Sequence, residues 1–483
     1  MAERTTPRRG WTLLAVSLAT FMTYLDNNIV NVAIPAIQRD LHLSTSGLEW
    51  AVSGYILVFA GLLLAGGRLG DIFGRRRMFL AGLAVFSLAS LAAGLAGDVD
   101  ALVASRAVQG LGAAMVTPTT LALISATYPD TRERTAAIGT WSAVGALALA
   151  VGPLLGGLIS QHLSWGWIFF INVPLGAATM VLAAWAIAPD VAAAVRTRVD
   201  VPGVVASSAT LFALTYALIE GSGKGWTSAP ILAAFAVSAL AATVFVTVER
   251  RAAEPMVDVA LFAERVFAGG VLAIVMWGFG LFGIYFFTSL YLQNVLGFSP
   301  TEAGAAFVPM ALLMATSAVL SERIAKAIGS HRSVALAMAL MAVGIGSVAL
   351  LGAHSSYLSL MPSFALIGVG GGLAVPLTAM VVGAMPEAQA GVASGIFNAA
   401  REVAGLLGIT VIGAVLTSRQ SAAARAGHTP IDSFLSGYRY GLVVAAILVA
   451  AGGVAAFLAL RSRPGTASGD APTDDHPEYA LAA

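Results

Sequence analysis

The sequence predicts an all-α membrane protein with fourteen transmembrane helices, arranged as two six-helix bundles with two additional central helices. Hydrophobic residues make up 58% of the 483 residues and charged residues only 11%, whereas soluble chains carry about 25% charged residues. The apolar residues fall into fourteen runs that are long enough to cross a bilayer as helices. Two sequence patterns of the first half also recur in the second, which indicates a duplicated architecture.

The fourteen apolar runs set the predicted spans. They are 12–33, 46–66, 78–97, 101–124, 136–160, 167–187, 201–220, 229–248, 267–292, 302–321, 333–352, 358–382, 391–416 and 439–460. Six spans in each half leave the two runs between 201 and 248 as an insertion. The expected units are a cytoplasmic N-terminal tail (1–10), a six-helix bundle (11–190), two inserted helices (196–250), a second six-helix bundle (251–463) and a disordered cytoplasmic tail (464–483).

The positions of lysine and arginine predict the orientation. With a cytoplasmic N-terminus, nineteen of the 26 Lys and Arg residues fall in cytoplasmic segments and five outside, while Arg106 and Arg401 lie within the membrane. Positive residues concentrate on the cytoplasmic side of membrane proteins. Lysine occurs only at Lys224 and Lys326, and alanine and glycine are abundant, which suggests a GC-rich bacterial source. We therefore expect a multi-pass protein of the bacterial inner (cytoplasmic) membrane, with both termini in the cytoplasm.

Composition and motifs argue against several functional classes. The net charge is +1 and no basic patch indicates nucleic-acid binding. The chain has no cysteine, so disulfides, thiolate metal sites and cysteine catalysis are absent. No Walker, zinc or nucleophile-elbow motif occurs, so we expect no catalytic residues, no metal and no cofactor. The first apolar run lacks a small-residue cleavage site and carries Asp26, which predicts a retained helix rather than a signal peptide.

The stretch Gly67–Arg77 lies between the second and third spans and is predicted to form a tight hairpin on the cytoplasmic face. Glycines allow a close turn, arginines mark the cytoplasmic side, and Asp71 can pair with an arginine or a helix N-terminus. The stretch resembles the GxLaDrxGrkxxL signature of the major facilitator superfamily, although an ordinary positive-inside loop would also carry these residues. The resemblance implies a gating loop made of Gly67, Gly70, Asp71, Gly74 and Arg75.

Two internal echoes support duplicated halves. Arg68, Leu69, Gly74 and Arg77 recur as Arg323, Ile324, Gly329 and Arg332, and Gly139, Gly152 and Gly157 recur as Gly395, Gly408 and Gly413. Duplicated halves are the architecture of transporters that rock two bundles around a central site. With two additional helices in the middle, the pattern resembles the fourteen-helix drug:proton antiporter-2 branch of the superfamily and implies its major facilitator fold.

Two charged residues inside apolar runs are candidates for proton coupling. Ionised Asp26 costs about 2.5–3.5 kcal/mol in hydrocarbon on insertion scales, and Arg106 must face a cavity or a partner rather than lipid. Asp26 can take up a proton from one side and release it to the other, and Arg106 would tune its proton affinity if their distance changed as the halves rock. Leu25–Pro35 resembles the LDxTIVNVALP motif of the fourteen-helix exporters, and Arg106 resembles the superfamily's fourth-helix arginine, which is linked to proton coupling. A static Asp26 and a static ion pair remain alternatives, and contact between the two residues stays open.

The fifth span carries a group of small residues. Glycine and proline together weaken a helix and allow a bend, and small residues permit close helix contact. The group resembles the antiporter motif of the superfamily's exporters, and a plain packing face is the alternative. Its members are Gly145, Gly152, Pro153, Gly156 and Gly157.

The stretch Trp167–Gly176 resembles the WRWIFLINVPxG segment of the same branch. Aromatic residues gather at membrane–water interfaces. We therefore expect this stretch to form an interfacial belt and assign it no role in a site.

Candidate substrate-binding residues are polar or aromatic residues within the spans: Asn31, Asn398, Arg401, Glu402, Trp277 and Tyr285. Arg401 and Glu402 lie in a stretch that resembles the family's NxxRQxGG segment, with Glu402 in place of the usual glutamine. Neighbours on a helix point about 100° apart, so we do not expect these two to pair well. Glu402 could bind a cationic drug or a second proton, or belong to a structural polar cluster. The aromatic side chains could stack on a drug, or face lipid or core.

These features together predict a proton-coupled antiporter that exports small amphipathic compounds, such as antibiotics, dyes or antiseptic cations, by alternating access. Its expected partners are a drug-like substrate, protons and the lipid bilayer, and the proton gradient replaces any cofactor. Asp26 is the clear core acid, with Glu402 as a second candidate, which favours monovalent or neutral cargo over dications. One alternative is a narrow-substrate metabolite or self-resistance exporter of the same fold. Another is a non-transporting membrane sensor or scaffold.

Overall fold

The computed structural model describes residues 8–190, 200–252, 255–385 and 387–461. Fourteen of its helices or helix pairs are long and apolar enough to cross a membrane, which confirms the predicted fold class. The first half comprises α1 (Arg9–Asp40), α2 (Thr45–Phe73), α3 (Arg75–Gly94), α4 (Val99–Thr127), α5 (Thr131–His162), α6 (Trp167–Phe170) and α7 (Asn172–Ala186). Then follow α8 (Val201–Lys224) and α9 (Ala229–Arg251). The second half comprises η1 (Val259–Ala263), α10 (Arg265–Asn294), α11 (Pro300–Ala306), α12 (Val308–Ile328), α13 (Ser330–Val348), α14 (Tyr357–Leu373), α15 (Pro376–Gly383), α16 (Glu387–Arg425) and α17 (Pro430–Ala459).

Three of the predicted spans are interrupted helices: α6 and α7, α11 and α12, and α14 and α15. Pro309 and Pro376 lie in the first turns of α12 and α15. Proline has no N–H to continue the preceding helix but fits a first turn, where that N–H would be unpaired. Pro174 is the third residue of α7, so a proline lies in the first turn after each of the three breaks.

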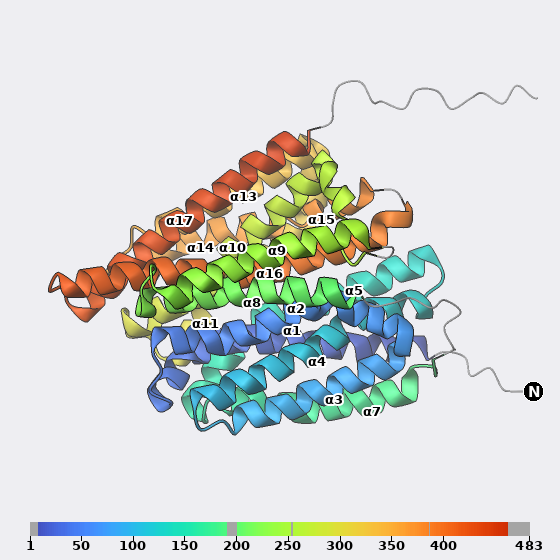
Figure 1. Cartoon of the computed structure of the whole chain (residues 1–483), viewed down its shortest axis with the longest axis horizontal. Coiled ribbons are helices and arrows are strands. Elements are labelled where there is room, and N and C mark those ends of the chain that lie inside the picture. Colours follow the sequence, from blue (N-terminus) through green and yellow to red (C-terminus); the bar gives the residue numbers. More distant parts are fainter. Residues whose placement is uncertain (1–7, 191–199, 253–254, 386, 462–483) are drawn as a thin grey trace, which may run out of the picture.

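The two halves lie side by side, with the first half in the lower part of Figure 1 and the second half above it. They meet where α5 packs on α11 and where α2 packs on α16. The inserted helices α8 and α9 pair with each other, and α8 contacts both α2 and α16. The insertion therefore lies along the seam between the halves. The limits of the predicted units stay a prediction, and the tail 464–483 falls outside the described residues, as does most of 1–10.

Two glycines form single-residue corners between consecutive helices. Gly74 joins α2 to α3 with φ 100° and ψ 133°, and Gly329 joins α12 to α13 with φ 88° and ψ 139°. Positive φ strongly favours glycine, which has no Cβ. The shared geometry supports the predicted duplication. We call the end of the molecule that carries these glycines the corner end, and the opposite end the far end.

The corner at Gly74 corrects the predicted hairpin Gly67–Arg77. The apolar run ends near residue 66, but α2 continues to Phe73, because a helix does not need apolar residues once it leaves the hydrocarbon. Asp190, which follows α7, accepts hydrogen bonds from the backbone N–H groups of Arg76 (2.9 Å) and Arg77 (3.1 Å). A carboxylate at a helix N-terminus satisfies groups that have no partner within the helix. The start of α3 is thus tied to the end of α7.

Candidate functional site

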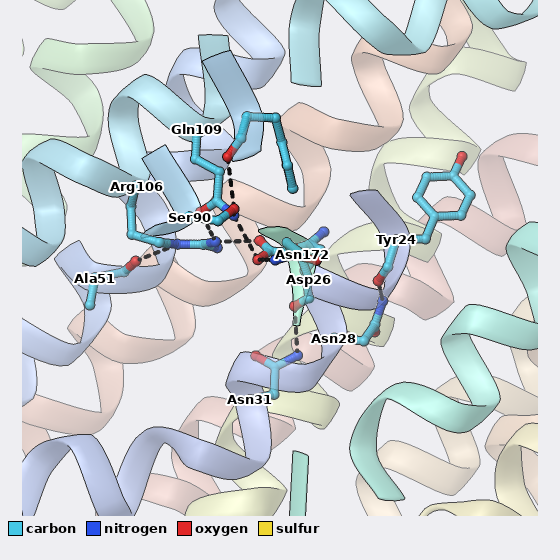
Figure 2. A network of polar contacts seen from close by, with 11 residues as sticks. Tyr24, Asp26, Asn28, Asn31, Ala51, Ser90, Arg106, Gln109 and Asn172 are labelled. Carbon is cyan, nitrogen blue, oxygen red and sulfur yellow. Dashed lines mark hydrogen bonds and ion pairs between the residues drawn. The ribbon is translucent and has the colours of Figure 1, made fainter. Parts of the chain in front are cut away.

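A polar cluster is enclosed in the first half, with Asp26 of α1 at its centre (Figure 2). Asp26 and Arg106 of α4 are both 0% exposed and form an ion pair through Oδ2 and Nη1. The other oxygen of Asp26 accepts hydrogen bonds from Nε2 of Gln109 (2.7 Å) and Nδ2 of Asn172 (2.8 Å). N–H donors to a carboxylate form strong, charge-assisted bonds. This arrangement therefore suits an ionised Asp26.

Arg106 is held from several sides. Its Nη1 also donates to Oε1 of Gln109 (2.7 Å), and its Nε donates to the carbonyl oxygen of Ala51 in α2 (3.3 Å). The guanidinium carbon lies 4.4 Å from the ring centre of Tyr55 and 5.5 Å from that of Phe169. Aromatic faces attract cations, more strongly when both are removed from water. The cation is therefore compensated although it is fully buried.

The structure answers the question that the sequence left open, because Asp26 and Arg106 are in contact. Both residues and all the partners above belong to the first half, so rocking of two rigid halves would not by itself change their distance. The expected tuning of Asp26 through a changing distance to Arg106 therefore does not follow from rocking alone. A change in this distance would require movement of helices within the first half.

Two residues of the cluster were missed from the sequence. Asn172 belongs to a stretch to which we assigned no site role, and this expectation was wrong because its amide contacts Asp26. Gln109, which also donates to Oγ of Ser90 (2.8 Å), was not singled out. The available signal was a side-chain amide inside an apolar span, where polar groups need partners.

A cavity of about 670 Å³ lies between the halves. At the corner end it is lined by Arg68, Asp71 and Arg75, whose side chains include an ion pair of 3.1 Å between the last two. The side chains of Asp71 and Arg75 are 45% and 42% exposed, so the cavity meets solvent at this end. Small-molecule sites commonly have volumes of roughly 300–1,000 Å³. Of the predicted gating residues, Gly67, Asp71 and Arg75 line the cavity, whereas Gly70 and Gly74 do not.

Deeper in the cavity, Arg401 of α16 meets α1. Its Nη2 donates to the hydroxyl of Tyr24 (3.0 Å) and to Oε1 of Glu402 (3.1 Å), and its Nε also donates to that oxygen (3.3 Å). The expectation that these two neighbours would not pair well was wrong, because the long arginine side chain bends back to reach the carboxylate. Asn398, one turn earlier, also lines the cavity.

The other three predicted substrate contacts lie outside this cavity. Tyr285 is 4% exposed and its ring centre lies 5.0 Å from that of Phe307. The hydroxyl of Tyr285, Nε1 of Trp277 and Oδ1 of Asn31 are buried without a hydrogen-bond partner among the described residues. The described cavity therefore unites Asn398, Arg401 and Glu402, and a substrate contact at Asn31, Trp277 or Tyr285 stays a prediction.

The small residues of α5 pack on α1. Gly145 faces the ring of Tyr24, Gly152 faces Asn28, and Gly156 faces the backbone of Ile29. A Cβ at Gly145 or Gly152 would lie 2.9 Å from an atom of its neighbour. These glycines therefore allow α1, which carries Asp26, to lie directly against α5.

The end of the same motif crosses to the second half. A Cβ added at Gly157 would lie 2.8 Å from the carbonyl carbon of Pro300 in α11, and one added at Gly304 would lie 2.8 Å from that of Pro153 in α5. The backbone N–H of Thr301 donates to Oε1 of Gln161 (3.1 Å), the last α5 residue but one. The halves are therefore in close contact at the far end, while the cavity reaches solvent at the corner end.

A further buried acid lies on the seam between the halves. Glu49 of α2 is 1% exposed, and its carboxyl group faces Gly413 of α16. A second acid, Glu220 of α8, accepts a hydrogen bond from Nε1 of Trp50, the residue next to Glu49 (3.0 Å), and pairs with Lys224 (3.3 Å). The Oε2 atom of Glu49 has no hydrogen-bond partner among the described residues. Glu49 was not among the residues predicted from the sequence.

Comparison with known proteins places the chain in a family. The family model described as "Major Facilitator Superfamily" matches residues 16–409. "Multidrug resistance protein Stp" of Mycobacterium tuberculosis (strain CDC 1551 / Oshkosh) is 35% identical over 412 residues, 85% of this chain and 76% of that protein. "Tetracenomycin C resistance and export protein" of Streptomyces glaucescens is 37% identical over 413 residues, 85% of this chain and 77% of that protein.

A solved structure shares the fold. The structure titled "Crystal structure of auto inhibited POT family peptide transporter" superposes with a TM-score of 0.68 at 14% identity, covering 98% of this chain and 99% of that one. At this identity the likeness shows the fold alone. The family match covers most of the chain, and the structure has two halves around a cavity. The chain thus belongs to the Major Facilitator Superfamily and is a membrane transporter, not an enzyme.

Proposed function

We propose that the chain exports small amphipathic compounds, such as antibiotics, dyes or antiseptic cations, in exchange for protons. The names of its relatives support export, since one is a multidrug resistance protein and another a resistance and export protein. The observation that carries the exchange with protons is the enclosed pair of Asp26 and Arg106. Ionisable residues inside membrane-spanning helices are rare and mark proton or substrate pathways.

The corner end would face the cytoplasm. This orientation follows from the nineteen Lys and Arg residues on that side of the predicted spans against five on the other. The cavity then opens to the cytoplasm, where cargo is loaded, and the contact of α5 with α11 closes the outer side.

The proposed cycle uses α1 as the link between cargo and proton. In the described conformation Asp26 accepts three N–H donors, as expected after a proton has left to the cytoplasm. Cargo would then enter the cavity beside Tyr24, two residues before Asp26 on the same helix. Once the far end opens, Asp26 would take up a proton from outside, and the neutral acid would no longer hold Arg106 as an ion pair. Net proton entry would drive cargo exit.

The test is Asp26→Asn in proteoliposomes with an imposed pH gradient. We expect pH-driven export to be lost while the variant stays folded, because the amide occupies the same space and cannot carry a proton. Glu322→Gln is the matched control, since Glu322 is 78% exposed and pairs with Lys326 on the surface. Export by the Asp26→Asn variant at the parent rate would refute the proposed mechanism.

A second candidate is a self-resistance exporter with one narrow substrate. The name of the 37% identical relative, which specifies tetracenomycin C alone, favours it. A panel of unrelated drugs in a hypersensitive host separates the two, because a narrow exporter would protect against one chemical class only.

A further inference from the structure

We propose that the cavity selects organic anions and neutral molecules rich in hydrogen-bond acceptors, and that Arg401 and Tyr24 recognise them. This inference rests on the proposed function, with the cavity as the export site, and specifies its substrate class. It departs from the expectation that Glu402 attracts a cationic drug, and it narrows the proposed cargo to neutral or anionic antibiotics and dyes, without antiseptic cations.

The charges around the cavity are unbalanced. Its described lining holds the arginines Arg68, Arg75 and Arg401 and the acids Asp71 and Glu402. Each acid is paired with an arginine at 3.1 Å, while Arg68 forms no ion pair within the described residues. A cleft with low-dielectric walls focuses the field of the charges that line it. The uncompensated charge is positive, so the field attracts anions.

The cation, and not the acid, faces the open space. The side chain of Arg401 is 30% exposed, whereas that of Glu402 is only 5% exposed. A ligand that reaches the inner part of the cavity meets the guanidinium first, with the carboxylate shielded behind it. A cationic ligand would have to compete with Arg401 for the carboxylate of Glu402, which disfavours the binding of cations at this point.

Two hydrogen-bond donors remain free to bind such a ligand. Nε and Nη2 of Arg401 are used by Glu402 and Tyr24, but Nη1 donates to no residue in the described chain and is not buried. The Tyr24 hydroxyl accepts from Arg401, so its own hydrogen remains available. A guanidinium and a phenol that are in contact with each other suit a carboxylate, phenolate or carbonyl oxygen.

The rest of the lining favours a ring system. Phe59, Leu63, Leu121 and Trp141 contribute apolar surface to the cavity. Nε1 of Trp141 already donates a hydrogen bond to Oγ1 of Thr20 (2.6 Å), so this side chain offers a ligand its ring and no donor. Aromatic side chains contribute large contact areas to ligand binding. The combined chemistry fits aromatic or alicyclic weak acids and polyphenols.

The experiment compares two dyes that share a xanthene ring and differ in charge: anionic fluorescein and cationic rhodamine 123. Binding to the purified full chain is measured by fluorescence anisotropy at neutral pH. We expect fluorescein to bind more tightly, and Arg401→Gln to weaken it about tenfold through loss of a charge-assisted bond, without weakening rhodamine 123. Glu402→Gln should strengthen fluorescein binding, because Arg401 loses its neutralising partner.

Arg439→Gln is the matched control. Arg439 is exposed at the far end, where it donates to the carbonyl oxygen of Leu351, so both dyes should bind as in the parent. Should Arg401→Gln fail to fold, Tyr24→Phe removes only one hydroxyl and should still weaken fluorescein. Tighter binding of rhodamine 123, no binding of either dye, or fluorescein binding unchanged in both variants would overturn the inference. The Asp26→Asn test of proton-driven export does not depend on these results.

Discussion

Replacing Gly157 by alanine should shift the protein toward a conformation that is open at the far end. The new Cβ would lie 2.8 Å from the carbonyl carbon of Pro300 and 2.9 Å from Cα of Thr301, whereas non-bonded carbon atoms prefer about 3.5–4.0 Å. The helices α5 and α11 would have to separate by about 1 Å, because the opposing atoms are backbone and cannot rotate away. Overpacking costs about 1–3 kcal/mol, which corresponds to a shift of about 5- to 150-fold in a two-state equilibrium.

The assay is a distance measurement between spin labels on opposite halves of the far end. The chain has no cysteine, so Ser164→Cys and His354→Cys provide two unique labelling sites, both exposed in loops at this end. In double electron–electron resonance, a longer distance between the two labels should be more populated in Gly157→Ala than in the parent.

Gly139→Ala is the matched control, because Gly139 lies on the same helix with no atom within 4 Å of an added Cβ. Both variants gain the helix propensity of alanine, so their difference isolates the steric effect. Gly304→Ala should reproduce the opening, since it meets the backbone at Pro153 from the other side. If folded Gly157→Ala kept the distances of the parent, the contact between α5 and α11 would not be what closes the far end.

Three further substitutions probe other parts of the structure. Asp71→Asn should slow transport severalfold without weakening dye binding, because its pair with Arg75 (3.1 Å) is half-exposed at the cavity mouth; an equal loss of binding would count against a gating role. Asp190→Ala should lower the free energy of unfolding by about 1 kcal/mol, the value of a helix cap, as measured by chemical denaturation; no change would show that the cap is dispensable. Glu49→Leu should raise the melting temperature, because burying an acid without a partner costs more than burying an apolar side chain of similar size; a lower melting temperature would reveal a stabilising partner.

The number and order of the membrane spans could be predicted, but the breaks within three of them and the ends of the helices could not. The second span was expected to end at 66 and the thirteenth at 416, whereas α2 continues to Phe73 and α16 to Arg425. Hydropathy measures how far a segment is apolar, and a helix continues into the polar interface wherever its backbone hydrogen bonds continue. The predicted hairpin contains three glycines, and only the backbone angles of the structure identify Gly74 as the corner.

The members of the buried cluster differ in how visible they were. Asp26 and Arg106 stood out because a charge inside an apolar run is costly. Their contact bridges 80 positions of sequence and depends on how α1 packs against α4. The same holds for Tyr24 and Arg401, which are 377 positions apart. Glu49 was overlooked because it lies near the start of its predicted span, where acids are usually solvated.

The placement of Tyr24 and Asp26 on α1 has a consequence for how such a transporter can change over time. Two residues apart on a helix, the side chains point in widely different directions, and Figure 2 shows Tyr24 directed away from the cluster around Asp26. The surface proposed to touch cargo and the site proposed to carry protons are thus separated by the thickness of one helix. Mutations can remodel the first without touching the second. New specificities can therefore arise while the proposed proton site is inherited unchanged.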